Sequence, residues 1–148
     1  MDARTFLRSC VLAASVCCSQ LAYSATAPCD LLTQSQVSTA VGKSVGAASA
    51  IANTGCSWST AGAPKITVSV SMQNEKMFAS AKGPVPPNTT KASISGVGDE
   101  AIFLGVPNFS SLWVRRGTSY LLVRIYGVSV SEAQTKLKDL ASAAVSKL

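Results

Sequence analysis

Two stretches decide the fold of this chain: Pro28-Cys29-Asp30-Leu31-Leu32-Thr33-Gln34-Ser35-Gln36-Val37 and Gly55-Cys56-Ser57-Trp58. Thr33 and Gln36 match a capping box, in which two side chains satisfy backbone N–H groups at the start of a helix. Leu32 and Val37 flank this cap as a hydrophobic staple, and Gly42 is placed to end the helix. The pattern predicts a short helix after Thr33, and its apolar side needs a core to pack against.

The residues before these stretches have the three parts of a secretory signal peptide. Arg4 and Arg8 are positive, residues 11–18 are apolar, and Ala22-Tyr23-Ser24 supplies small residues for cleavage. We therefore expect residues 1–24 to be a signal peptide and residues 25–148 to form a single domain. These features predict that the protein is periplasmic or secreted, and the alternative is that a lipid anchors it in the cell envelope. The apolar run is shorter than the roughly 20 residues that span a bilayer, so we expect no membrane-spanning segment.

The cysteines predict one disulfide. Removing residues 1–24 removes Cys10, Cys17 and Cys18, which leaves Cys29 and Cys56. In an oxidising compartment these two have one intramolecular pairing. A redox or metal pair is the alternative, but the chain has no C-x-x-C spacing and no histidine to complete a zinc site. We expect a structural bridge that clamps the first helix onto the first strand pair.

Patterns of strands and helices alternate along the rest of the chain. Strand patterns cover residues 56–60, 65–72, 101–104, 111–116 and 120–126, and helix patterns follow Asn74 and Ser129. Residues 44–54 fit either an edge strand or a loop. The resulting order predicts an α+β fold, with an antiparallel sheet of about five strands packed against two to three helices on one face. Residues 84–90 are a proline-stiffened loop, for which a rigid crossover is favoured over a binding role.

The composition and the motifs argue against several kinds of catalytic and binding site. The chain has no histidine, the most common general base and metal ligand. It contains 13 Lys and Arg against 7 Asp and Glu, but the positive residues are scattered, whereas nucleic-acid binders cluster them. The sequence also lacks an S-x-x-K pair and a phosphate-binding glycine loop. We expect no cofactor, no metal and no nucleic-acid partner.

Short motifs in a fixed order carry a resemblance: Pro28-Cys29-Asp30-Leu31-Leu32-Thr33, then Gly55-Cys56-Ser57-Trp58, then Gly96-Val97-Gly98-Asp99-Glu100-Ala101. In these motifs the chain resembles a family of small exported bacterial proteins and lipoproteins of unknown function. The resemblance implies bacterial export, a Cys29–Cys56 bridge and an α+β fold. It implies no activity and no catalytic residues, and this chain lacks a convincing lipid-attachment site.

The missing catalytic residues favour a non-catalytic binding domain, whose partner would be an unknown protein or an anionic envelope component. The expected binding surface lies on the second hairpin and the glycine-rich bend, at Trp113, Arg115, Arg116, Tyr126, Asp99 and Glu100. One alternative is an envelope enzyme that uses Asp99 or Glu100 with Lys91 or Arg124. Two others are an inhibitor of a secreted enzyme and an envelope protein that binds a second copy of itself.

Overall fold

The computed structural model describes residues 26–148, so the expected signal peptide and its three cysteines lie outside the described residues. Within that part, the helices are α1 (Gln34–Val41), α2 (Glu75–Lys82) and α3 (Val130–Val145), preceded by the 3-10 turn η1 (Pro28–Asp30). The strands are β1 (Ser49–Ile51), β2 (Gly55–Ser59), β3 (Thr67–Gln73), β4 (Thr90–Ser93), β5 (Glu100–Val106), β6 (Phe109–Arg116) and β7 (Ser119–Tyr126). None of the helices in residues 26–148 is long and apolar enough to cross a membrane.

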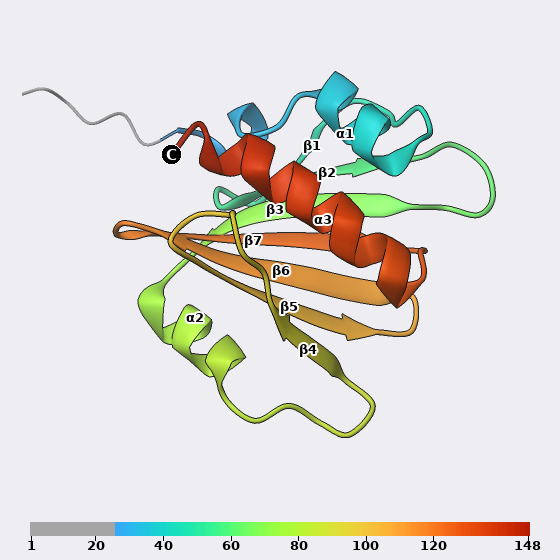
Figure 1. Cartoon of the computed structure of the whole chain (residues 1–148). Coiled ribbons are helices and arrows are strands. Elements are labelled where there is room, and N and C mark those ends of the chain that lie inside the picture. Colours follow the sequence, from blue (N-terminus) through green and yellow to red (C-terminus); the bar gives the residue numbers. More distant parts are fainter. Residues whose placement is uncertain (1–25) are drawn as a thin grey trace, which may run out of the picture.

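All seven strands form one antiparallel sheet in the order β1-β2-β3-β7-β6-β5-β4, which confirms the α+β class (Figure 1). The sheet has two strands more than the predicted five. β1 comes from the segment that fits a strand or a loop, and its residues are exposed. β4 is short, polar and mostly exposed, so it lacks the apolar alternation by which a strand is recognised in a sequence.

The main core lies between one face of the sheet and helices α1 and α3 (Figure 1). Both predicted capping boxes are present, at Thr33 with Gln36 and at Ser129 with Glu132. Inward residues of β3 and β7 alternate with outward ones. All the inward ones except the partly buried Met72 are fully buried: Val68, Val70, Leu121, Val123 and Ile125. These residues meet the apolar stripe of α3, which runs from Ala133 to Val145.

The predicted Cys29–Cys56 disulfide is confirmed, with Cα atoms 5.0 Å apart. Cys29 lies in η1, immediately before α1, and Cys56 lies in β2 on the core face of the sheet. The bridge therefore attaches the start of the domain to the sheet.

The prediction that all helices cover one face is wrong for α2. The Phe78 ring of α2 lies 5.5 Å from the Tyr120 ring of β7, and Tyr120 faces away from the main core. Phe78 and Ala81 are buried, as are Ile102 and Leu122, which face the same way from β5 and β7. These apolar residues require a second covering layer, and the eight residues of α2 cover only one end of that face.

Candidate functional site

A pocket of about 300 Å³ lies on the face of the sheet that α2 leaves open. One wall is the segment that follows α2, and the floor is the outward side of β5, β6 and β7. We call it the proline-loop pocket. Its lining residues are Val85, Pro86, Thr89, Leu104, Gly105, Val106, Phe109, Ser111, Trp113 and Arg124. Within residues 26–148, three larger hollows of about 420 to 430 Å³ lie along α3. Two are lined mainly by polar side chains such as Thr135 and Lys138, whereas the third, between α1 and α3, also has the apolar side chains of Ala40, Leu140 and Ala143.

Strand alternation brings the floor of the pocket together. Phe109, Ser111 and Trp113 occupy alternate positions of β6 and therefore share one face. Ser111 lies directly opposite Leu104 on β5 and Arg124 on β7. The floor of the pocket therefore has three side chains next to one another across the strands: the apolar Leu104 of β5, the hydroxyl of Ser111 on β6 and the guanidinium-bearing Arg124 of β7.

Two aromatic rings line the pocket, Phe109 and Trp113. The Phe109 ring packs against the Tyr126 ring in a tilted arrangement, with centroids 4.8 Å apart and 32° between the planes, which supports it from outside the pocket. Tyr126 itself is 41% exposed and does not line the pocket. A ligand in the pocket would therefore meet a supported aromatic surface.

The loop wall is held at both ends. The Lys91 ammonium on β4 donates hydrogen bonds to the carbonyls of Lys82, at 2.6 Å, and Gly83, at 2.7 Å. This contact ties β4 to the end of α2, where the loop begins. Pro84, Pro86 and Pro87 restrict the backbone between these anchors. The wall is preformed, so a ligand need not order it.

Among residues 26–148, Arg124 is the one arginine or lysine that lines the pocket. It is half-buried, and no ion pair or hydrogen bond joins its guanidinium to another of residues 26–148. The neighbouring arginine of the sheet, Arg115, pairs with both Asp99 and Glu100. The contrast leaves Arg124 as a free cation facing an apolar space.

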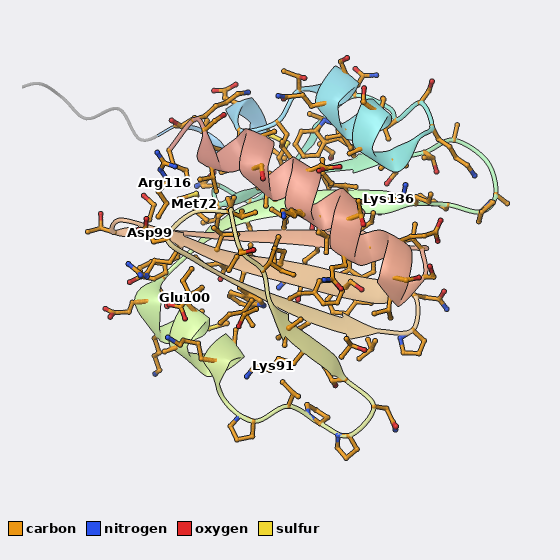
Figure 2. The ribbon with its side chains drawn as sticks, viewed as in Figure 1. Met72, Lys91, Asp99, Glu100, Arg116 and Lys136 are labelled. Atoms are coloured by element: carbon orange, nitrogen blue, oxygen red, sulfur yellow. A yellow bond between two sulfur atoms is a disulfide. The ribbon has the colours of Figure 1, made fainter. Side chains whose placement is uncertain are left out.

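Asp99 and Glu100 have structural contacts outside the pocket, toward the same end of the sheet as Arg116 (Figure 2). The Asp99 carboxylate accepts a hydrogen bond from Gly117 N at 2.7 Å, in the turn between β6 and β7. Glu100 joins Lys82 of α2, at 2.7 Å, to Arg115 of β6. The enzyme alternative requires Asp99 or Glu100 to share one cleft with Lys91 or Arg124. Neither carboxylate lines the pocket with Arg124, and Lys91 is hydrogen-bonded to the carbonyls of Lys82 and Gly83.

Of the six residues predicted to form one binding surface, two lie at the pocket and four lie elsewhere. Trp113 lines the pocket, and Tyr126 supports it through Phe109. Arg115, Asp99 and Glu100 form an ion-pair cluster, and Arg116 is exposed at the end of β6. Sequence reasoning missed Leu104, Phe109 and Ser111, although the alternation along β5 and β6 was a usable signal for them.

Among residues 26–148, no three Cys, Asp or Glu side chains lie together as a metal site would require. No family model, no curated protein and no solved structure matches this chain. The function therefore has to be argued from the geometry of the pocket, and the resemblance to exported bacterial proteins stays a prediction.

Proposed function

We propose that this chain is an exported, non-catalytic binding domain whose ligand occupies the proline-loop pocket. The observation that carries the proposal is an apolar pocket with preformed walls, two aromatic rings and a single unpaired cation. Binding sites for small molecules combine mostly apolar walls with a few well-placed polar groups, as this pocket does.

The size of the pocket indicates a small ligand. Its volume of about 300 Å³ stands at the lower end of the range for ligand sites. A compact ring system or a short branched chain fits that volume better than a polymer. The aromatic rings of Phe109 and Trp113 favour a flat, apolar body that can stack on them.

Export is supported by the pattern of residues 1–24 and by the Cys29–Cys56 bridge. Disulfides of this kind persist in oxidising compartments, such as the periplasm or the extracellular space. A binding domain in that setting would meet small molecules or anionic envelope components directly.

An NMR titration with naphthalene-2-carboxylate and naphthalene-2-carboxamide tests the proposal. Both probes are flat and apolar, and they differ in charge. We expect at least one of them to shift the backbone signals of residues 85–89 and 104–113 and the indole N–H signal of Trp113. The indole of Trp58, which is 1% exposed on the opposite face of the sheet, should not move and serves as an internal reference.

A blocking variant makes the test site-specific. Thr89→Trp places a large ring at the wall of the pocket and should abolish the shifts. Ser142→Trp adds the same ring on the exposed side of α3, far from the pocket residues, and should leave them intact. The proposal is wrong if neither probe shifts the pocket residues, or if Thr89→Trp and Ser142→Trp bind equally well.

A second candidate function is self-association through β1. This strand ends the sheet, its three residues are exposed, and Ile51 is 49% exposed. Residues 44–64 contain no charged side chain, whereas the other edge strand, β4, carries Lys91. Uncharged edges are prone to pair with another strand. Sedimentation over a range of concentrations should show a dimer that Ile51→Lys abolishes, and a monomer at every concentration would exclude this candidate.

A further inference from the structure

We infer that the ligand of the proline-loop pocket is a small apolar carboxylate, and that Arg124 with the flanking hydroxyls of Ser69 and Ser111 binds its anionic group. The inference rests on the proposed binding function and adds the chemical class of the ligand. It depends on three features of β3, β6 and β7: their register, the absence of partners for their polar groups, and the apolar surroundings.

The register places a hydroxyl on each side of the cation. Arg124 of β7 lies directly opposite Ser69 of β3 and directly opposite Ser111 of β6. Residues paired in this way have Cβ atoms about 5 Å apart on the same face of the sheet. An anion bound at the guanidinium is therefore within reach of the Ser111 hydroxyl, which lines the pocket, and of the Ser69 hydroxyl, which lies beside Arg124 outside the pocket lining.

These three polar groups have no partner within the described part of the chain. No hydrogen bond joins the hydroxyl of Ser69 or Ser111 to another of residues 26–148, and no acidic residue there pairs with Arg124. Ser111 is only 4% exposed, and it lines the pocket. Neither group is enclosed without a partner, as Ser110 Oγ is, so the Ser111 hydroxyl and the Arg124 guanidinium are accessible and free to bind an acceptor in the pocket.

A carboxylate satisfies this arrangement. The guanidinium presents a planar fork of N–H donors that matches two carboxylate oxygens, and serine hydroxyls donate to the remaining lone pairs. The apolar side chains of Leu104 and Trp113 exclude water from one side, which strengthens a charge-assisted hydrogen bond. The same side chains require the rest of the ligand to be apolar, so a small hydrophilic acid such as acetate would gain little from the pocket.

The alternative role for Arg124 is structural, with its aliphatic stem covering apolar surface and its charged end in water. The two naphthalene probes separate these roles, because they have the same shape and only one is charged. Their dissociation constants would be measured by NMR titration for the wild-type protein, Arg124→Met, Ser111→Ala and Arg116→Met. Arg116→Met is the matched control, since it removes the same charge from an exposed position outside the pocket.

We expect the wild-type protein to bind the carboxylate at least about ten times more tightly than the amide, as a charge-assisted hydrogen bond predicts. Arg124→Met should lower the affinity for the carboxylate much more than that for the amide, so that the preference is lost, and Ser111→Ala should reduce the preference by about two- to fivefold. Arg116→Met should keep the preference.

Equal affinity of the wild-type protein for both probes would overturn the inference and leave the proposed binding function intact. An equal loss of preference in Arg116→Met and Arg124→Met would also overturn it, because the effect would then come from net charge. If neither probe binds in the pocket, the proposed function fails together with the inference.

Discussion

Ser111 and Arg124 lie directly opposite each other on β6 and β7, and neither side chain has a hydrogen-bond or ion-pair partner among the described residues. Four residues further along β6, close to the turn into β7, the polar side chains behave differently. There Arg115 forms ion pairs with both Asp99 and Glu100. The sheet thus has an ion-paired charge cluster near its turn and two accessible polar groups in the pocket.

Arg124→Met should leave the free energy of unfolding within about 0.5 kcal/mol of wild type, because the guanidinium forms no ion pair or hydrogen bond with another of residues 26–148 and Met keeps an apolar side chain. Urea denaturation measures this directly. A loss of several kcal/mol would show that Arg124 is a structural residue and would contradict its role as the ligand-binding cation of the pocket.

Glu100→Gln should cost no more than about 1 kcal/mol, since its partners Lys82 and Arg115 are partly exposed and exposed ion pairs contribute little. It should not change the affinity of the pocket for naphthalene-2-carboxylate. The enzyme alternative predicts the reverse pattern, in which Glu100→Gln removes the activity of the protein. The stability of Asp99→Asn would be measured beside that of Glu100→Gln, because Asp99 accepts a hydrogen bond from Gly117 N in addition to its ion pair with Arg115.

Replacing Cys29 and Cys56 together by alanine should destabilise the domain by about 3.5 kcal/mol, the chain-entropy value for a loop of 27 residues. The bridge lies on the core face of the sheet, opposite the pocket. Ligand affinity below the melting temperature should therefore stay at the wild-type value. A parallel loss of affinity and stability would place the disulfide in the binding machinery.

Gly98→Ala should be more destabilising than Gly96→Ala. Both glycines have positive φ angles, of 60° and 80°, which cost other residues about 1 kcal/mol or more. A Cβ at Gly98 would also lie 2.5 Å from Arg115 O and 2.6 Å from Val114 Cγ1, whereas one at Gly96 meets nothing within 4 Å. Thermal melts of the two variants compare them, and equal melting temperatures would contradict the close packing at Gly98.

The capping box of α3 predicts a pH dependence of stability. Hydrogen bonds from the Ser129 side chain and backbone hold the pKa of Glu132 below its ordinary value of 4.5. A depressed carboxyl pKa stabilises the fold above the unfolded-state value, and this stabilisation is lost as the pH falls from 4.5 through the folded-state value. The difference in urea midpoint between wild type and Glu132→Gln should shrink over that window. A difference independent of pH would contradict the shift.

The sequence predicted best those features that depend on local patterns. The capping boxes at Thr33 and Ser129, the alternation of β3 and β7 and the Cys29–Cys56 pair are all visible within short stretches. β4 was missed because its pairing with β5, and not its own residues, makes it a strand. Tertiary context overrides local preference in such segments.

The pocket was only partly predictable for the same reason. Trp113 stood out as an exposed aromatic residue, but its partners come from three strands and a loop that are distant in the sequence. The proline loop was expected to be a rigid crossover, and its residues also form a wall of the pocket. The clustering of Asp99 with Arg115 depends on the β5–β6 register, which no single stretch reveals.

A crystal structure of the protein with 6-bromonaphthalene-2-carboxylate tests the central claim most directly, because the anomalous signal of bromine locates the ligand independently of the protein. We expect one bromine peak under the proline loop, with the naphthalene ring against Trp113 and the carboxylate about 2.8 Å from the Arg124 guanidinium. A bromine peak confined to the hollows along α3, or a carboxylate turned toward solvent and away from Arg124, would contradict it.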